Sequence, residues 1–223
     1  MKRFICGSPE YEVYMQEHAH ARGEKDFLQS IAGTGMVAVD VGGHFGLAAC
    51  VISRAVGRTG RLFCFEPVAE YRQALEDNVT ANGLTNVEVV PAAVGKEAGT
   101  THLCLDGGGT SIVPNRQRDR VPAKLVCLDE FFQQRRLGRL DLLNMDCEGS
   151  ELLVLEGAQA LLSRNHAKVF VEIHHGFLKA LGHSVHDIVG LLEGLAYKVS
   201  TVSLSDLSLG DNWNQCEYLY ARQ

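Results

Sequence analysis

The stretch VAVDVGGHFG, residues 37–46, decides the fold of this chain. Its first residues are those of a buried strand, with Asp40 near the end, and glycines follow at positions 42, 43 and 46. Glycine permits a tight turn and lets a ligand approach bare backbone, and the first amides of a helix have no partner within it. We therefore predict a strand, a ligand-binding turn and then a helix over residues 45–56.

Apolar runs and amphipathic stretches alternate along the rest of the chain as in repeated βα units. Further strands are expected over residues 61–66, 86–94, 139–146 and 168–175. Helices are expected after Pro67, near Ser150 and over residues 184–195, where Ser184 and Asp187 have capping-box spacing. Residues 197–204 and 215–222 predict two strands joined by a turn, so a parallel core ends in an antiparallel unit. Residues 106–122 form the one long loop.

Composition narrows the classes of protein to consider. The chain has 223 residues, a length that suits one α/β domain with a short appendage. No apolar run is long enough to span a bilayer and the start has no signal-peptide pattern. The seven cysteines include no CxxC pair, which predicts reduced thiols in a cytoplasmic protein.

Charge bears on the choice of partner. The formal net charge of -6 argues against broad nucleic-acid binding. Arg116, Arg118 and Arg120 are a local exception. These arginines are typical of a solvated loop. The alternative is that they form an anion-binding edge for a substrate that carries phosphate.

The register of the glycines distinguishes between nucleotide ligands. A dinucleotide-binding GxGxxG that ends at Gly46 would need glycine at position 41, which is Val41, so an NAD-dependent oxidoreductase is disfavoured. A carboxylate such as Asp40 suits a ligand amino group better than a pyrophosphate. Glu66 ends the second strand, where an acidic residue can accept hydrogen bonds from both ribose hydroxyls. These motifs together predict a nucleoside-bearing ligand.

Two later predicted strands end in side chains that can accept or donate protons. Asp146 and Glu148 follow the fourth strand, and Glu172 shares one face of the fifth strand with His174 by period-two alternation. A histidine can accept a proton near neutral pH, and a neighbouring carboxylate can orient it. We interpret Glu151 only as a favourable charge at a helix N-terminus.

No metal site is expected from the sequence. The pair His18 and His20, together with His174 and His175, leaves a metal site open as an alternative.

The motifs taken together resemble the FkbM-type methyltransferases. The similar stretches occur in the family's order between residues 36 and 174: VAVDVGGHFG, FCFEP, NVTANGLTNVEVVPAAVG, GGTSIVPN, VCLDEFF, LDLLNMDCEGSELLVLEGA and VFVEIH. The stretch from Asp146 to Ala158 is the most specific of them. One departure is Gly43-His44, where many members have Ala-Asn.

This resemblance implies a Rossmann-like class I methyltransferase fold: an α/β domain with a mostly parallel seven-stranded sheet, a C-terminal antiparallel strand and helices on both faces. Residues 36–223 are then the methyltransferase domain, and residues 1–35 a helical appendage or lid. It also implies S-adenosylmethionine as the donor and O-methylation of a hydroxyl on a sugar or secondary metabolite, hence a small-molecule partner. An N- or RNA-methyltransferase and a noncatalytic nucleoside-binding scaffold are the alternatives.

On this interpretation the site residues have two roles. His174 is the base, Glu172 orients it, and Asp146 and Glu148 line the acceptor side. The residues expected to bind the cofactor are Asp40, Gly42, Gly43, His44, Phe45, Gly46, Glu66, Pro67, Ala92 and Asp146.

Overall fold

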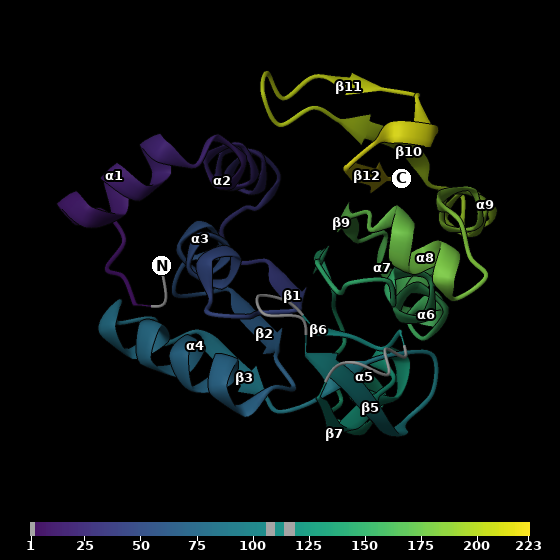
Figure 1. The fold of residues 1–223 in the computed structure, drawn as a ribbon, viewed down its shortest axis with the longest axis horizontal. Helices are drawn as coiled ribbons and strands as arrows, with labels where there is room; N and C mark the ends of the chain where they lie inside the picture. The colour runs from purple at the N-terminus through teal and green to yellow at the C-terminus, as the bar shows by residue number, and fades with distance from the viewer. Residues whose placement is uncertain (1–2, 106–109, 114–118) are drawn as a thin grey trace.

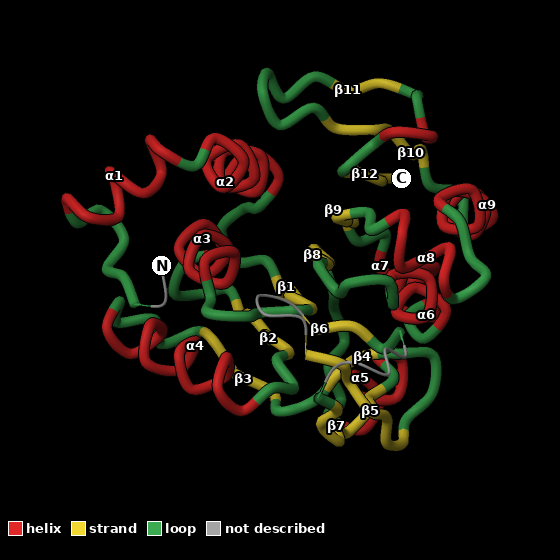
Figure 2. The backbone as a smooth tube through the Cα atoms, in the orientation of Figure 1, coloured by secondary structure: helices red, strands yellow, loops and turns green. Residues whose placement is uncertain are grey.

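A central β-sheet organises the computed structural model, which describes residues 3–105, 110–113 and 119–223 (Figures 1 and 2). In these residues the sheet has eight strands in the order β11-β10-β12-β9-β8-β1-β2-β3. The strands are β1 (Val37–Val41), β2 (Arg61–Phe65), β3 (Val87–Val90), β8 (Leu142–Met145), β9 (Lys168–Glu172), β10 (Lys198–Val202), β11 (Leu209–Gly210) and β12 (Tyr218–Arg222).

The pairing of the strands confirms the predicted sheet. Strands β3, β2, β1, β8 and β9 run parallel to one another. Strand β12 lies between β9 and β10 and is antiparallel to both. Seven strands therefore form the expected mostly parallel sheet, and the two-residue β11 extends its edge.

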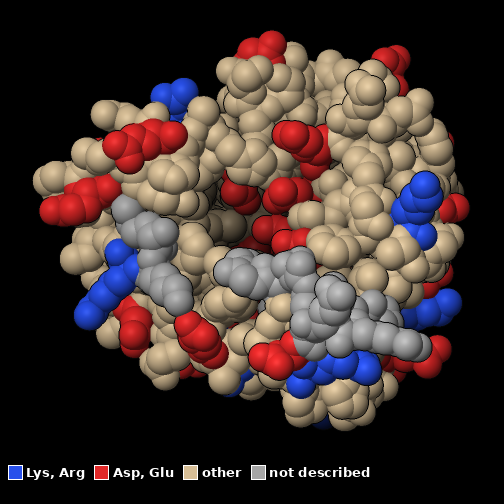
Figure 3. Space-filling view, viewed as in Figure 1, with Lys and Arg blue, Asp and Glu red and all other residues tan. Residues whose placement is uncertain are grey.

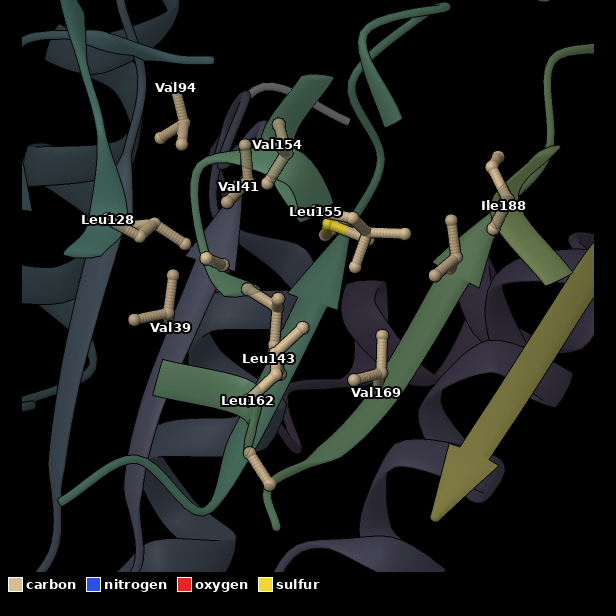
Figure 4. Close-up of a cluster of buried hydrophobic side chains, with 14 of the residues drawn as sticks. Val39, Val41, Val94, Leu128, Leu143, Val154, Leu155, Leu162, Val169 and Ile188 are labelled. Carbon is tan, nitrogen blue, oxygen red and sulfur yellow. The ribbon is translucent and has the colours of Figure 1, made fainter. Parts of the chain in front are cut away.

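Helices cover both faces of the sheet, as expected. One face packs on α2, α3 and α4, and the other on α5, α6, α7, α8 and α9. Figure 4 shows Val39, Leu143 and Val169 of the second face in one cluster of buried side chains with Leu155 and Leu162. The helices are α1 (Pro9–Glu17), α2 (Ala19–Ile31), α3 (Leu47–Val56), α4 (Ala69–Ala81), α5 (Leu128–Gln134), α6 (Glu151–Glu156), α7 (Gln159–Asn165), α8 (His175–Ala180), α9 (Val185–Gly194) and the 3-10 turn η1 (Trp213–Gln215). Among the described residues, none of these helices combines the length and apolar character needed to span a bilayer.

The strand predicted over residues 86–94 is wrong as a single element. It divides into β3 and β4 (Ala93–Val94), which belong to different sheets. Pro91 lies between them and has no amide hydrogen to donate to a ladder, so the pairing of β3 ends there. The second sheet has the order β4-β7-β5-β6, with β5 (Gly99–Leu105), β6 (Thr110–Ser111) and β7 (Arg120–Val126). Because β6 and the first three residues of β7 lie within residues 106–122, the expected single loop is also wrong there.

The helix predicted from Ser150 is interrupted in the structure. It divides at Gly157 into α6 and α7. A side chain at Gly157 would lie 2.2 Å from the carbonyl oxygen of Gly95, so the backbones approach too closely for any larger residue. The carboxylate of Asp129 then accepts hydrogen bonds from the amides of Ala160 and Leu161, which satisfies the first turn of α7.

The strand predicted over residues 168–175 ends earlier, at Glu172. His174 is the N-cap of α8, so its imidazole belongs to the turn between β9 and α8. The capping box at Ser184 and Asp187 is confirmed, since both reciprocal hydrogen bonds are present.

Two asparagine side chains of the α4 segment hold the N-terminal arm, residues 3–8. Oδ1 of Asn78 accepts from the amide of Phe4 at 3.0 Å, and its Nδ2 donates to the carbonyl of Phe45 at 2.8 Å. Asn82 donates to the carbonyl of Phe4 at 3.0 Å and accepts from the amide of Cys6 at 2.8 Å. Asn78 is fully buried, so the arm and the glycine turn are joined inside the protein.

We predict that Asn78→Ala lowers the free energy of unfolding by about 3 kcal/mol, because it leaves two buried backbone groups without this partner. Urea denaturation measures this difference. The control is Thr80→Ala, at an exposed position of the same helix, which should change stability by about 0.5 kcal/mol or less. Equal stability of the two variants would contradict the proposed link.

Candidate functional site

The polar residues predicted from the sequence gather at one edge of the sheet. Strands β1, β2, β8 and β9 are parallel, so their carboxyl ends lie at the same edge. The chain leaves β1 toward β2 on one side, and β8 lies on the other side of β1. This is a topological switch point, the place where open α/β sheets bind ligands.

Gly42 brings the ends of β1 and β8 together. Its φ of +91° is one that glycine adopts readily, and a Cβ at this position would lie 1.8 Å from the carbonyl oxygen of Asp146. The amide of Asp146 donates to the carbonyl of Val41 at 2.9 Å, while the amides of Gly42 and Gly43 donate to the carbonyl of Phe65. The turn is therefore tied to the ends of both neighbouring strands.

Glu66 supports the same turn from β2. Its side chain is 3% exposed, and its two oxygens accept hydrogen bonds from the amides of His44 and Val68, each at 2.8 Å. Burial raises the pKa of Glu66, and these two amides oppose the shift. Each carboxylate oxygen has a second lone pair, so Glu66 can still accept hydrogen bonds from a ligand.

A pocket lies between the glycine turn and the second sheet. Six of the residues predicted to bind a cofactor line it, and the ring of Tyr71 contacts His44 edge-on at 4.4 Å. Phe45, Gly43, Gly46 and Asp40 are outside the lining. The lining residues are Val41, Gly42, His44, Phe65, Glu66, Pro67, Tyr71, Ala92, Ala93, Val94, Leu103, Ile112, Asp146, Cys147, Glu148 and Ser150.

Asp40 lies behind the pocket, within the sheet. Its carboxylate is 1% exposed and accepts hydrogen bonds from Asn144 Nδ2 at 2.7 Å and from Cys64 Sγ at 3.2 Å. Both partners face Asp40 across the ladders of β8 and β2. Burial raises the pKa of Asp40, and the two hydrogen bonds oppose the shift. The sequence indicated Asp40 but gave no sign of these partners.

His174 is surrounded by carboxylates. Its Nε2 lies 3.6 Å from Asp146 Oδ1, 3.7 Å from Glu148 Oε2 and 3.8 Å from Glu172 Oε1. Figure 3 shows acidic side chains gathered in a hollow of this face. The structure therefore brings the four predicted catalytic residues together.

The carboxylate that contacts the other ring nitrogen is Glu151, which sequence analysis interpreted only as a helix-terminal charge. Nδ1 of His174 donates to Glu151 Oε1 at 2.8 Å, whereas Glu172 is farther away and near Nε2. Glu151 also accepts from the amide of Gly149, and its side chain is fully buried. The signal available in the sequence was a second acidic residue three positions beyond Glu148. Helix periodicity could not show that the side chain of Glu151 is directed toward His174, just after β9.

The pKa values of His174, Asp146 and Glu148 are shifted upward. Burial alone would lower the pKa of His174, but the hydrogen bond to Glu151 and the charge of Asp146 raise it to about 9. The side chain of Asp146 keeps 45% of its surface open to the hollow yet lies deep in the molecule. Desolvation and the charge of Glu172 therefore raise its pKa to about 8. Burial also raises the pKa of Glu148.

The N-terminal helices contribute a further carboxylate. Burial and the charges of Asp146 and Glu172 raise the pKa of Glu24, on α2, to about 8. On the same side, His20 Nε2 lies 2.6 Å from the hydroxyl of Tyr218. The sequence gave no reason to include Glu24 or Tyr218 in the site.

The four histidines considered as a metal site are not brought together. His18 contacts the carbonyl of Tyr14, His20 contacts Tyr218, and His175 contacts the carbonyl of Cys216. In the described part of the chain, Asp146, Glu148 and His174 are the group with metal-ligating atoms close together.

The loop predicted over residues 106–122 is described only in part. Ser111 Oγ donates to the backbone oxygen of Glu148 at 2.6 Å, and Ile112 lines the pocket. Arg120 begins β7. Arg116 and Arg118 lie outside the described residues.

Comparison with known proteins identifies one family. Residues 40–199 match the family described as Methyltransferase FkbM domain. A comparison with curated proteins gave no match.

Solved structures resemble the fold at low sequence identity. Methyltransferase FkbM from Methylobacillus flagellatus KT is 15% identical with a TM-score of 0.54, over 88% of this chain and 50% of its own, so the present chain spans half its length. An rRNA methylase from Streptococcus thermophilus is 11% identical with a TM-score of 0.51, over 88% and 91% of the two chains. An O-methyltransferase from Bacillus cereus, in complex with SAH, is 15% identical with a TM-score of 0.53, over 91% and 80%. At these identities the likeness establishes the fold alone.

We predict that Gly42→Ala lowers the free energy of unfolding by about 3 kcal/mol, because the added methyl group overlaps the carbonyl of Asp146 and the backbone is left-handed. Chemical denaturation measures the loss. Gly138→Ala is the matched control, since a Cβ there meets nothing within 4 Å. Losses of similar size in both variants would show that the close approach is not required.

Proposed function

The chain belongs to the FkbM methyltransferase family, and from this premise we propose that it transfers a methyl group from S-adenosylmethionine to a hydroxyl oxygen of a small-molecule acceptor. One observation carries the proposal: the nucleoside-type pocket at Gly42 and Glu66 shares Asp146 and Glu148 with the group around His174. Donor and acceptor sites that share a wall can hold two reactants in line, which is a large part of catalysis in a bimolecular transfer.

The pocket residues fit the donor. The turn at Gly42 offers bare backbone, and the helix α3 begins directly after it. Glu66 has lone pairs left for ribose hydroxyls, and Pro67, Tyr71 and Ala92 offer an apolar surface for a purine ring. When bound, S-adenosylmethionine supplies a methyl group on a positively charged sulfur.

Asp40 has a different part in this proposal from the one expected. Both of its oxygens already accept hydrogen bonds, from Asn144 and Cys64. We assign it to holding β1, β2 and β8 in register beneath the glycine turn. Contact between Asp40 and the methionine amino group stays a prediction.

The group around His174 can receive the proton that an acceptor hydroxyl must lose. Glu151 holds the ring through Nδ1 and leaves Nε2 facing the acceptor side, next to Asp146 and Glu148. A ring with a pKa of about 9 carries a second proton at neutral pH. At that pH the ring accepts a proton only in the fraction of molecules that has lost its second proton, a fraction that grows as the pH rises toward 9, and the carboxylate of Glu148 is an alternative proton acceptor.

Two features favour a small hydroxylated acceptor over RNA. The net charge is -6, and the hollow beside the pocket contains acidic side chains, which repel phosphate groups. Residues 1–35 would act as a lid over this acceptor side. Glu24 of α2 supports that role, because Asp146 and Glu172 influence its pKa.

Methyl transfer from labelled S-adenosylmethionine tests the proposal. Panels of sugars and other hydroxylated metabolites, of amines and of RNA are supplied as acceptors. We expect labelled product with hydroxylated acceptors. Transfer only to amines or to RNA would contradict O-methylation, and donor binding without transfer to any panel would favour a noncatalytic scaffold.

We predict that Glu66→Gln weakens binding of S-adenosylhomocysteine about 10- to 100-fold, because a lost hydrogen bond to a charged group costs about 1.5–3 kcal/mol. Calorimetry measures the affinity, and the melting temperature reports the part that Glu66 contributes to the turn. Glu193→Gln, at an exposed position on α9, is the control. Unchanged affinity in folded Glu66→Gln would remove Glu66 from the site.

We predict that His174→Ala lowers kcat about 10²- to 10⁴-fold while affinity for S-adenosylhomocysteine stays nearly the same. The reason is that His174 lies on the acceptor side and is not part of the pocket lining. The neighbouring His175 provides the control, since its ring contacts the carbonyl of Cys216 and His175→Ala should keep its turnover. A fully active, folded His174→Ala variant would contradict the assignment.

A further inference from the structure

Three carboxylate oxygens lie at nearly equal distances from His174 Nε2. Three carboxylate oxygens surround this nitrogen at 3.6, 3.7 and 3.8 Å, from Asp146, Glu148 and Glu172. These separations are too long for hydrogen bonds. Two ligands bound about 2.2 Å from one ion lie roughly 3.1 Å apart at a right angle and roughly 3.8 Å apart at 120°. The separations between Nε2 and each of these oxygens therefore fall within the range that two ligands of a shared ion can have.

The orientation of the imidazole fits the same arrangement. Glu151 receives the hydrogen bond from Nδ1, so Nε2 is the nitrogen presented to the carboxylates. Histidines that bind metals usually donate their other nitrogen to a carboxylate or carbonyl in this way.

A second feature, separate from those distances, also indicates a missing partner. Glu151 is 0% exposed and directed at His174, and its Oε2 has no hydrogen-bond partner in the described part of the chain. A buried, unpaired carboxylate oxygen is costly, and a positive charge beyond the ring would offset that cost.

The charges are not balanced by basic side chains. Asp146, Glu148, Glu151 and Glu172 surround the single ring of His174, and Glu24 faces the same group. In the described residues, none of these carboxylates forms an ion pair with lysine or arginine. Such a group is stable only with protons or a cation among the oxygens.

We propose that Asp146, Glu148 and His174 bind one divalent metal cation. The three ligand atoms lie within 4.8 Å of one another, and three protein ligands leave positions open for water or an acceptor oxygen. Two carboxylate oxygens with one imidazole nitrogen suit Mn²⁺ and similar transition-metal ions better than Mg²⁺, which prefers oxygen ligands alone.

The site would add a function to the acceptor side. Asp146 and Glu148 also line the donor pocket, so the cation would lie next to the transferred group. A bound cation lowers the pKa of an oxygen that it coordinates. With the cation bound, Nε2 would hold the cation, so the base role proposed above for the His174 ring would pass to Glu172 or to water, which would take the proton of the acceptor hydroxyl. This consequence rests on the proposed function, whereas the binding of the cation does not.

Electron paramagnetic resonance with Mn²⁺ alone tests the site, because free Mn²⁺ gives a six-line signal that weakens on binding. The chelator-treated full chain should bind one Mn²⁺. Asp146→Asn and Glu148→Gln should each bind it at least about 10-fold more weakly, and Glu193→Gln should bind it as the wild type does. Melting temperatures establish that the variants are folded.

The result that overturns the site is an undiminished free-ion signal with the wild-type chain, or equal affinity in the wild type and both folded ligand variants. Either would mean that protons alone neutralise the group. Methyl transfer with no Mn²⁺ binding would reject the site and leave the proposed function standing. Mn²⁺ binding without transfer would support the site and count against the function.

Discussion

The contact between Gly42 and the carbonyl of Asp146 is the constraint on which this edge of the sheet depends. Strands β1 and β8 are hydrogen-bonded to each other, so the chain that leaves β1 must turn away within one residue of the end of β8. Only a residue with no side chain can make that turn beside a carbonyl group. The donor pocket and the acidic hollow are adjacent because this approach is so close.

Two kinds of buried polar group stand on either side of that contact, and they differ in how completely they are satisfied. Asp40 and Glu66 have hydrogen bonds to both carboxylate oxygens, so they strengthen the framework. Glu151 has one oxygen without a partner, and the carboxylates near His174 repel one another. Conflict of this kind is typical of functional sites, where local stability is given up for reactivity.

The sequence predicts which residues lie at the carboxyl edge of the sheet when they follow a strand. It does not predict the residues that helices bring to the same edge. The predicted strands place Glu66 and Asp146 at the shared carboxyl edge of the sheet, where each directly follows its strand, whereas His174, predicted within a strand, lies in the turn after β9. Strand periodicity cannot identify Glu151 or Glu24, since a helical residue near the site depends on how the helix packs.

The errors in the fold have a similar origin. Pro91 is visible in the sequence, yet periodicity carried the predicted strand across it into a second sheet. Gly157 interrupts a helix because another backbone lies against it, a contact between distant segments that no local pattern contains.

The hydrogen bonds that hold the N-terminal arm, made by the side chains of Asn78 and Asn82, have a consequence for how this chain can vary. Both amides bind backbone groups of Phe4 and Cys6 and no side chain of the arm, so exchanging the exposed Ile5 leaves every one of those bonds in place. Position 5 can therefore change without altering the path of the arm over the glycine turn.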